Sequence, residues 1–341
     1  MLYSVRRDSN MELLRIVAMF LVLTVHAAFY ALGTPTTQEC RLQPMMAYGQ
    51  FFWGSVSMTC VNTFVLLSGW FGIRPKLRSF SSFIFQCLFF SLGIYILWVC
   101  LGMTRLSWRG ITDCLFVHEN YWFIVSYIGL YLFSPMVNAF VDNSKKTDVL
   151  SFLIFFFIFQ IIFSYCSKAA PFLSTGCNSM SFIGLYVLAR YIRLYPSRLT
   201  TLSAWTYFSI FLLMALFSSI SAYTCAYMGY EFLIGRFYTY VSPFVIVPAL
   251  LLLLLFSRMS FSNNVVNWFA ISSFSVYLIH MHPCLIQYYV KMVNVINDNT
   301  SGVFTLLFIF LFLFGVFVVS VLLDKIRLLV WNLISVRKAK E

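Results

Sequence analysis

Two stretches of the chain are too long and too apolar to belong to a water-soluble domain. Residues 151–167 read SFLIFFFIFQIIFSYCS, and residues 302–323 read GVFTLLFIFLFLFGVFVVSVLL. A helix of about 20 apolar residues crosses a bilayer core about 30 Å thick and satisfies its own backbone hydrogen bonds there. Only 10% of the 341 residues are charged, against about 25% in a typical soluble domain. The sequence therefore predicts an all-α, polytopic integral membrane helical bundle.

Apolar runs separated by charged residues predict about ten transmembrane helices. The predicted spans are 12–31, 49–72, 80–101, 121–141, 149–167, 180–193, 202–224, 240–257, 265–290 and 302–323. We expect the first span to stay in the protein, because it lacks a small-residue cleavage site and already contains Arg15 and His26.

The distribution of basic residues predicts the orientation. If the N-terminus is cytoplasmic, sixteen of the 23 Lys and Arg residues fall inside and six fall outside, as the positive-inside rule requires. The inside set is Arg6, Arg7, Arg74, Lys76, Arg78, Lys145, Lys146, Arg190, Arg193, Arg198, Arg258, Lys325, Arg327, Arg337, Lys338 and Lys340. The outside set is Arg41, Arg105, Arg109, Lys168, Arg236 and Lys291. Both termini are therefore predicted to be cytoplasmic.

A net charge of +12 does not indicate a nucleic-acid partner here. The basic residues stand in short loops beside apolar spans, where membrane orientation and contact with anionic lipids account for them. The nine cysteines form no CxxC pair and no metal-ligand spacing, so we interpret them as isolated thiols. We expect membrane lipids, and no nucleic acid, as partners.

We expect one transmembrane domain over residues 1–323 and an amphipathic, basic cytoplasmic tail over residues 324–341. In the tail, Ile326, Leu329 and Leu333 fall on one helical face with basic residues around them. Such a helix is typical of a segment that lies along a membrane surface. No repeat or long linker suggests a second membrane domain.

The first predicted helix carries three polar residues whose insertion into a membrane costs free energy. Arg15 and His26 are eleven residues apart, so they differ in direction by only about 20° and lie about 16 Å apart along the axis. Glu12 precedes Arg15 by one turn on the same stripe. Arg15 could simply pair with Glu12 at the headgroups, and His26 could be an interhelical hydrogen-bond donor. Their alignment favours a functional site.

A second group of polar residues follows the next predicted helix. Ser68 and Gly69 lie near its cytoplasmic end, and glycine there allows close approach of a helix or a ligand. Arg74 and Arg78 follow at once. They fit a positive-inside loop, and they equally fit a patch that binds the phosphates of a cytoplasmic cofactor.

His280 and His282 end the ninth predicted span. Side chains two residues apart on a helix point about 200° from each other, so these imidazoles cannot chelate one metal ion without unwinding of the helix. We expect no metal site. His118 stands on the predicted outer side beside an aromatic anchor and fits an interfacial position.

Four short patterns in this order resemble the acyltransferase-three family of membrane O-acyltransferases. They are ELLR at 12–15 with His26 after ten intervening residues, NTFVLLSGW at 62–70, YWF at 121–123 leading into LYLFSP at 130–135, and SVYLIH at 275–280. The resemblance spans nearly the whole chain. Many family members have aspartate where this chain has Glu12 and Asn62, so an acidic role at position 62 does not carry over.

The resemblance implies transfer of an acyl group, usually acetyl from cytoplasmic acetyl-CoA, to a hydroxyl of a surface polysaccharide or a lipid-linked glycan precursor in a bacterial inner membrane. The family's paired arginine and histidine map to Arg15 and His26. The matching residues Trp122, Tyr131 and His280 are expected to support the substrate site. The chain resembles the stand-alone, polysaccharide-modifying type.

The predicted chemistry also fits the residues themselves. Acyl transfer from a thioester to a hydroxyl needs a base of near-neutral pKa or an imidazole that briefly carries the acyl group, and His26 suits either role. Arg15 could bind part of the donor or orient Glu12. Ser68, or backbone amides near Gly69, could stabilise the oxyanion.

Two other functions fit some of these features. A multi-pass transporter or flippase of a glycan or lipid-linked intermediate would also place Arg, Glu and His within the membrane. However, the chain shows no matching halves and no paired Gly- or Pro-interrupted helices. A non-catalytic sensor would not explain why Arg15 and His26 lie on one face of the helix. Consumption of a thioester separates an acyltransferase from both.

Overall fold

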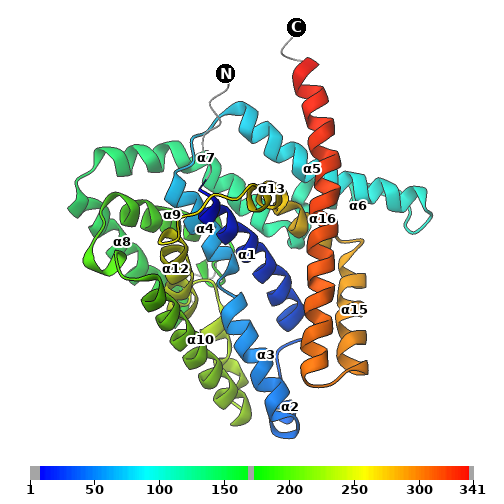
Figure 1. The fold of residues 1–341 in the computed structure, drawn as a ribbon, viewed down its shortest axis with the longest axis horizontal. Coiled ribbons are helices and arrows are strands. Elements are labelled where there is room, and N and C mark those ends of the chain that lie inside the picture. Colours follow the sequence, from blue (N-terminus) through cyan, green and yellow to red (C-terminus); the bar gives the residue numbers. More distant parts are fainter. Residues whose placement is uncertain (1–7, 168–172, 338–341) are drawn as a thin grey trace. The chain divides into compact units, whose positions relative to one another are not determined.

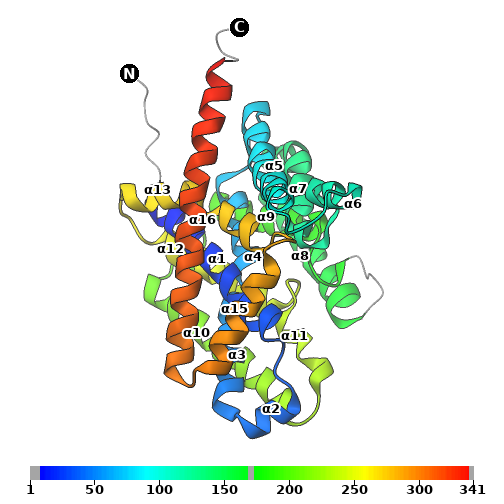
Figure 2. The same ribbon diagram turned by 90° about the vertical axis from the view of Figure 1, so that its right-hand side faces the viewer.

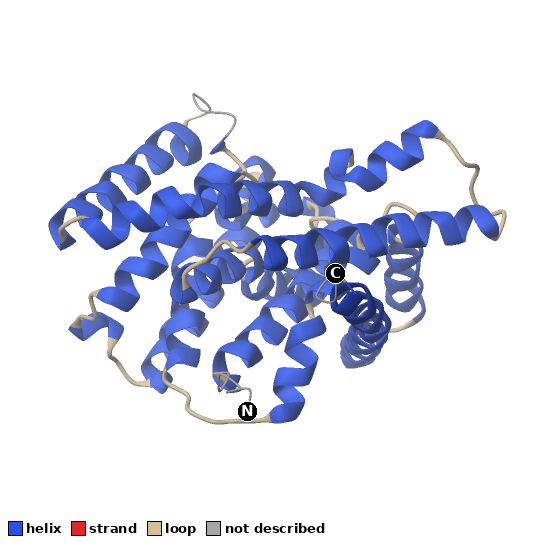
Figure 3. Ribbon diagram, turned by 90° about the horizontal axis from the view of Figure 1, so that it is seen from above, coloured by secondary structure: helices blue, strands red, loops and turns tan. Residues whose placement is uncertain are grey.

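The structure is a computed structural model that describes residues 8–167 and 173–337. This part of the chain consists of helices and loops and contains no strand (Figures 1 and 3), so the predicted all-α class is confirmed. Some basic residues used to predict the orientation lie outside the described residues. They are Arg6, Arg7, Lys168, Lys338 and Lys340.

The described chain forms sixteen α-helices and several short π- and 3-10-helical turns. The first eight α-helices are α1 Ser9–Val25, α2 Thr37–Leu42, α3 Pro44–Ser57, α4 Cys60–Phe71, α5 Leu77–Cys100, α6 Trp108–Thr112, α7 Trp122–Asn143 and α8 Lys146–Gln160. The others are α9 Ser179–Leu194, α10 Ala204–Tyr227, α11 Gly235–Tyr238, α12 Pro243–Ser257, α13 Asn264–Ser272, α14 Phe274–His280, α15 Ile286–Asn299 and α16 Val303–Arg337. The π-helical turns are η1 His26–Ala31, η2 Asp113–Val117 and η4 Ile161–Cys166, and the 3-10 turns are η3 Glu119–Tyr121, η6 Arg198–Thr200 and η7 Glu231–Leu233.

Eight helical segments of the described chain are long and apolar enough to cross a membrane, which confirms the polytopic membrane class. They are Ser9–Ala31, Pro44–Phe71, Leu77–Cys100, Trp108–Asn143, Lys146–Cys166, Ala204–Tyr227, Glu231–Ser257 and Val303–Ser335. Two further predicted spans differ from these. The sixth corresponds to α9, which has only 16 residues, fewer than the roughly 20 that span a bilayer.

The ninth predicted span, 265–290, is not one continuous helix. It is divided into α13, α14 and the start of α15, with breaks at Ser273 and at 281–285. Pro283 lies in the second break, where its missing backbone N–H and its ring do not disturb a helix. Hydropathy alone could not locate these breaks, because the apolar character continues across them.

The helices pack into two compact units. Unit 1 comprises Met1–Arg74 and Ser126–Asn267, and unit 2 comprises Pro75–Val125 and Trp268–Glu341. In unit 1, α4 packs against α9, α12 and α1, while α10 packs against α12 and α3. Glycine at position 69 is needed for this packing, because a Cβ there would lie 2.9 Å from Cβ of Ala189 and would clash with the Tyr186 carbonyl.

Hydrogen bonds join the helix termini of unit 1 at two opposite ends. The first end contains the start of α1 and the ends of α4, α9 and α12. Its contacts include Asn10 Nδ2 to Phe256 O at 2.9 Å, Arg193 Nη1 to Trp70 O at 2.8 Å and Arg258 Nη2 to Thr200 O at 3.0 Å. The second end contains α2 and the end of α10. Its contacts include Thr37 Oγ1 to Glu231 Oε1 at 2.9 Å, Arg41 Nη2 to Tyr227 O at 3.2 Å and Tyr223 Oη to Cys40 O at 3.1 Å.

These two ends separate the basic residues of unit 1 as the sequence predicts. Arg193 and Arg258, both expected inside, make contacts at the first end, and Arg41, expected outside, makes its contact at the second end. The helices between them run alternately from one end to the other, so the predicted alternation of loops holds within unit 1. Which end faces the cytoplasm stays a prediction.

In unit 2, α14 packs against α5 and α16, and α15 packs alongside α16. The views agree on this last pair, in which the two helices lie side by side (Figures 1 and 2). α16 is a single helix of 35 residues. It continues past Leu323, where we expected the membrane domain to end and a separate tail to begin.

We expect reporter fusions after Arg198 and after Gly229 to report opposite sides of the membrane. The first site lies in the loop between α9 and α10, at the first end of unit 1, and the second follows α10 at the second end. Alkaline phosphatase, which is active only outside the cytoplasm, should be inactive after Arg198 and active after Gly229. A fusion after Arg258 serves as a control and should match Arg198. Equal activity at Arg198 and Gly229 would contradict the predicted orientation.

Candidate functional site

Glu12 and Arg15, near the start of α1, form an ion pair. Arg15 Nη1 donates a hydrogen bond to Glu12 Oε2, three residues earlier. The Glu12 side chain is 13% exposed and that of Arg15 is 34% exposed. Glu12 lies in the first turn of the helix, where a carboxylate also interacts favourably with the helix dipole. The pair therefore reduces the free-energy cost of two charges near the beginning of a membrane helix.

His26 marks the point where the first helix changes from α to π geometry. α1 ends at Val25, and η1 begins at His26. Because the chain is α-helical from Arg15 to Val25, a turn of about 100° per residue places His26 on the face of Arg15, about 16 Å along the axis. The imidazole is half-buried and lies edge-on to Tyr30, with 6.2 Å between ring centroids. π-helical turns of this kind are frequent at functional sites.

Contacts from α3 stabilise the π-helical turn. Gln50 Nε2 donates hydrogen bonds to the backbone carbonyls of Ala28 and Gly33. The Phe29 ring packs onto Gly54, where any Cβ would clash with it. These contacts satisfy carbonyl groups at the end of the helix and fix the segment that begins with His26.

A cavity of about 400 Å³ adjoins η1 in the same unit. Its lining is mostly apolar and includes Phe29, Met58 and Tyr238. Glu231 also lines it, and its Oε1 atom accepts hydrogen bonds from the backbone N–H and the hydroxyl of Thr37. The cavity provides space for a substrate close to the turn that carries His26.

A tyrosine that the sequence reasoning missed contacts the predicted residue Ser68 and lies within electrostatic range of Arg15 and Tyr131. Tyr127 Oη lies 3.2 Å from Ser68 Oγ. Ser68 donates its proton to the Phe64 carbonyl at 3.0 Å, so Tyr127 is the donor in this contact. Tyr127 also interacts electrostatically with Arg15 and Tyr131. Its position one turn before Tyr131 on an apolar helix was the available signal.

The predicted donor-binding residues take different positions. Gly69 contacts α9 closely, and this packing accounts for the glycine. Arg74, at the end of unit 1, and Arg78, in the first turn of α5 in unit 2, both have exposed side chains. Exposure suits a solvated loop and also suits binding of phosphates, so their role in donor binding stays a prediction.

Two side chains and the backbone of Ile73 fix the end of α4 near Arg74. Tyr186 Oη accepts a hydrogen bond from the Ile73 N–H at 2.8 Å and donates one to Asn138 Oδ1 at 2.7 Å. Asn138 Nδ2 in turn donates to the Ile73 carbonyl at 2.7 Å. This closed ring of hydrogen bonds holds the chain where it leaves α4. It gives the predicted donor loop a rigid start.

His280 and Trp122 lie in unit 2, where each has aromatic neighbours. His280 is 3% exposed, and its Nδ1 donates to the Val276 carbonyl. Its ring lies 5.4 Å from that of Tyr289, and the Trp122 ring lies edge-on to Phe123 at 6.0 Å. These contacts account for the burial of the His280 ring, and its role in supporting the substrate site stays a prediction.

His282 is also bonded to the surrounding backbone. Its Nε2 donates to the Ser91 carbonyl at 2.9 Å, and its Nδ1 accepts the Cys284 N–H at 3.1 Å. The His282 ring is buried, and both of its nitrogens are used. His282 therefore anchors the break after α14 to α5.

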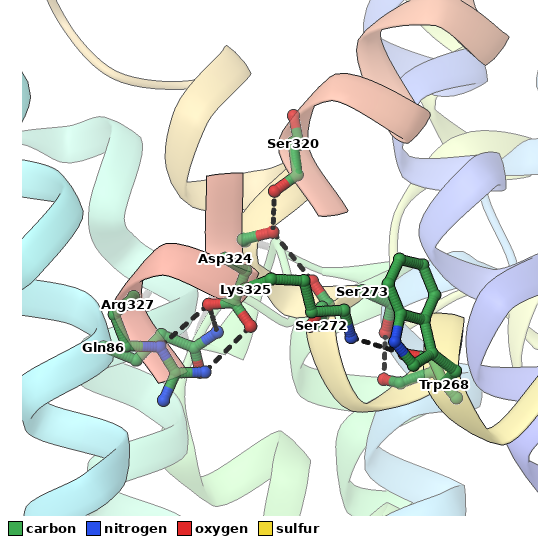
Figure 4. Close-up of polar contacts among 10 residues, drawn as sticks. Gln86, Trp268, Ser272, Ser273, Ser320, Asp324, Lys325 and Arg327 are labelled. Carbon is green, nitrogen blue, oxygen red and sulfur yellow. Dashed lines mark hydrogen bonds and ion pairs between the residues drawn. The ribbon is translucent and has the colours of Figure 1, made fainter. Parts of the chain in front are cut away.

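The sequence reasoning also missed a buried ion pair in α16. Arg327 Nε and Nη2 donate to the two carboxylate oxygens of Asp324 at 2.9 and 2.8 Å (Figure 4). Gln86 Nε2, from α5, donates to Asp324 Oδ1 at 2.9 Å. Asp324 is 0% exposed and Arg327 is 3% exposed. A bidentate pair with an additional hydrogen bond compensates for the loss of hydration of both charges.

Lys325 points away from this pair. Its Nζ donates to the Trp268 carbonyl at 2.7 Å and lies 3.9 Å from the centre of the Trp268 ring (Figure 4). Two polar contacts, from Gln86 to Asp324 and from Lys325 to the Trp268 carbonyl, thus tie α16 to α5 and α13, in a segment we expected to be a surface tail.

Comparison with known proteins gives one match. The family model Acyl_transf_3, described as an acyltransferase domain, matches residues 8–325. Neither a curated protein nor a solved structure matches the chain. The matched region includes α1 with Glu12 and Arg15 and η1 with His26, and it ends within α16, after Asp324.

We expect Asp324→Ala to destabilise the protein strongly, because it leaves Arg327 buried without its carboxylate. Removal of one partner of a buried pair costs about 3–5 kcal/mol, whereas replacement of both by apolar residues is often neutral. The double variant Asp324→Leu/Arg327→Leu should therefore regain much of the lost stability. Thermal unfolding of purified protein in detergent measures both effects. Asp298→Ala, at an exposed carboxylate of the same unit, is the matched control, and equal effects at positions 298 and 324 would contradict the prediction.

Proposed function

Because this chain belongs to the acyltransferase-three family and is a membrane acyltransferase, we propose that it transfers an acetyl group from acetyl-CoA to a glycan. The acceptor is a hydroxyl of a surface polysaccharide or of its lipid-linked precursor, and the membrane is a bacterial inner membrane. His26 acts as general base or as transient acyl carrier.

The position of His26 is the observation that carries this proposal. It is a half-buried imidazole at the start of a π-helical turn, in the helical segment that also carries the Glu12–Arg15 pair. Phe29, in the same turn, lines a cavity. Partial exposure allows the ring to contact a substrate.

The proposed reaction needs one proton transfer in each direction. As a base, His26 takes the proton of the acceptor hydroxyl while the hydroxyl oxygen attacks the thioester carbonyl. The carbon–sulfur bond then breaks, and the CoA thiolate takes up the proton. In the alternative route, the imidazole nitrogen attacks the thioester carbonyl, the carbon–sulfur bond breaks and CoA leaves as thiolate. The acceptor oxygen then attacks the acetyl group on the imidazole, the carbon–nitrogen bond breaks, and the hydroxyl proton passes to the thiolate. Both routes give the same products.

The oxyanion that forms in either route needs a hydrogen-bond donor. Ser68 and backbone amides near Gly69 are the candidates that we predict from the sequence. In the structure the Ser68 hydroxyl donates to the Phe64 carbonyl and the Tyr127 hydroxyl donates to Ser68, while the Gly72 N–H is bonded to the Ser68 and Gly69 carbonyls. Each of these groups must release its present bond to serve an oxyanion, so the oxyanion is assigned to no single one of them.

Donor binding is assigned to the exposed arginines after α4. CoA carries several phosphates, and guanidinium groups bind phosphate through paired hydrogen bonds. Arg74 and Arg78 have exposed side chains that can reach such a ligand. Arg74 follows the rigid end of α4 at Ile73.

We expect His26→Ala to reduce acetyl transfer by about 10²–10⁴-fold, the usual contribution of a general base, or by more if the imidazole carries the acyl group. The protein should still fold, because hydrogen bonds between membrane helices contribute little stability on average. Release of CoA thiol from acetyl-CoA by purified protein measures turnover, and thermal unfolding checks the fold.

His118→Ala is the matched control for this substitution. That imidazole is also half-buried, and its Nδ1 accepts only a local hydrogen bond from the Asn120 N–H at 3.2 Å. Its loss should leave turnover nearly unchanged. A folded His26→Ala protein with more than about a tenth of wild-type activity would exclude His26 as the base.

We expect the double variant Arg74→Gln/Arg78→Gln to raise KM for acetyl-CoA more than it lowers kcat, because these residues should bind the donor in the ground state and in the transition state alike. Steady-state kinetics with varied acetyl-CoA provide the measurement. Lys145→Gln/Lys146→Gln, at another exposed basic pair predicted inside, should leave KM unchanged. If both double variants behave alike, the arginines only orient the membrane domain.

A further inference from the structure

A second cavity lies within unit 2 and is not used by the proposed mechanism. Its volume is about 310 Å³, and it is an open pocket lined by α5, the loop after it, α6, the start of η2 and residues 282–287. Small-molecule sites usually measure about 300–1,000 Å³, so this cavity suits one small ring rather than a large cofactor. Its lining combines aromatic rings with hydrogen-bonding side chains.

The aromatic wall is formed by Tyr95 and Trp98. The Tyr95 hydroxyl accepts the Ser107 N–H at 2.9 Å and donates to the Arg105 carbonyl at 3.2 Å, which fixes the ring. Trp98 is half-buried, and its ring lies edge-on to Tyr288 at 6.3 Å. One ring is thus held rigidly, and the other has a partly exposed surface. A flat apolar surface of this kind suits the face of a sugar ring.

The polar wall is formed by Arg109, Asp113 and Gln287. Arg109 and Gln287 have exposed side chains, and Asp113 is half-buried. Arg109 and Asp113 form no ion pair with each other or with another side chain in the described part of the molecule. Guanidinium groups donate hydrogen bonds, carboxylates accept them, and amides do both. This combination can bind several hydroxyl groups at once.

The charges of this wall exclude one obvious alternative. A phosphate site needs an excess of positive charge or a cluster of donors, but the carboxylate of Asp113 offsets the charge of Arg109. A neutral, polyhydroxylated ligand has both donors and acceptors at each hydroxyl and can use all three side chains. The balance of charge therefore favours a sugar over a phosphorylated cofactor.

The backbone behind the cavity is strained. Phe116, within η2, has φ of +71°, the only positive φ of a non-glycine residue in the described chain. Non-glycine residues adopt this conformation at a cost, and such strain clusters at functional sites. The Phe116 ring lies edge-on to Tyr121 at 6.0 Å, and Tyr121 is fully buried with no hydrogen-bond partner for its hydroxyl. The same turn carries Asp113 and Cys114 into the cavity lining.

We propose that this cavity binds one sugar residue of the acceptor glycan, which stacks on Trp98 and gives its hydroxyls to Arg109, Asp113 and Gln287. This inference rests on the proposed function, in which the acceptor is a glycan. It agrees with the predicted orientation, which places Arg105 and Arg109 on the outer side.

Saturation-transfer difference NMR tests the proposal with the full-length protein. The probes are the methyl glycosides of glucose, galactose, mannose, rhamnose and N-acetylglucosamine, in a detergent without a sugar headgroup. At least one glycoside should give a signal with the wild-type protein. Trp98→Ala and Asp113→Asn should lose most of that signal. Trp108→Ala is the matched control, because Trp108 lies in the adjacent helix α6, is 79% exposed and is absent from the cavity lining, so it should keep the signal.

His26→Ala separates this inference from the proposed function. If both hold, this variant binds the glycoside as the wild-type does but no longer transfers acetyl. If His26→Ala keeps its turnover, the proposed role of His26 is excluded, while the NMR signal of the glycoside still tests sugar binding at Trp98. The sugar site is overturned if no glycoside binds, or if folded Asp113→Asn and Trp98→Ala proteins both keep the wild-type signal. Because Asp113→Asn changes only the charge, it keeps the test valid if Trp98→Ala does not fold.

Discussion

A charged or polar group inside a membrane protein must find its partner within the protein, and this requirement fixes much of the structure. Backbone groups meet it by forming helices, and charged side chains meet it by pairing. Glu12 with Arg15 and Asp324 with Arg327 form pairs three residues apart on single helices. Such a pair forms as soon as its helix does, so it adds no constraint on how the helices assemble. A contact between helices, such as Gln86 to Asp324, then sets the packing of α5 against α16.

This distinction explains how far the sequence predicts the fold. Apolar runs report burial in lipid directly, so the all-α class and most spans follow from them. The end of the last span was placed at Leu323 because Asp324, Lys325 and Arg327 look like an exit into water. In the structure α16 continues to Arg337, and the carboxylate and guanidinium are buried together. An ion pair lowers the free-energy cost of burying two charges, whereas a hydropathy scale treats each charged residue as if it had no partner. The hydropathy pattern therefore ended the predicted span too early.

The candidate site also combines features that follow from the sequence with features that only contacts between helices determine. Arg15 and His26 share a face because of helix geometry alone, which the sequence contains. Tyr127 joins Ser68 through contact between α4 and α7, and no spacing along the chain reports that distance. Gly69 shows the opposite case, in which the sequence suggested a functional role and the structure shows a packing role. A glycine near a proposed site allows either ligand approach or close helix packing. The neighbours Tyr186 and Ala189 show that Gly69 serves helix packing.

The π-helical turn at His26 connects the site to the fold. A π turn is intrinsically less favourable than an α turn, so it persists where tertiary contacts stabilise it. Gln50 bonds the carbonyls of Ala28 and Gly33, and Gly54 provides the space that Phe29 occupies. Both contacts come from α3. The orientation of the imidazole is therefore set by a neighbouring helix, and a change at Gln50 or Gly54 would alter His26 without touching it.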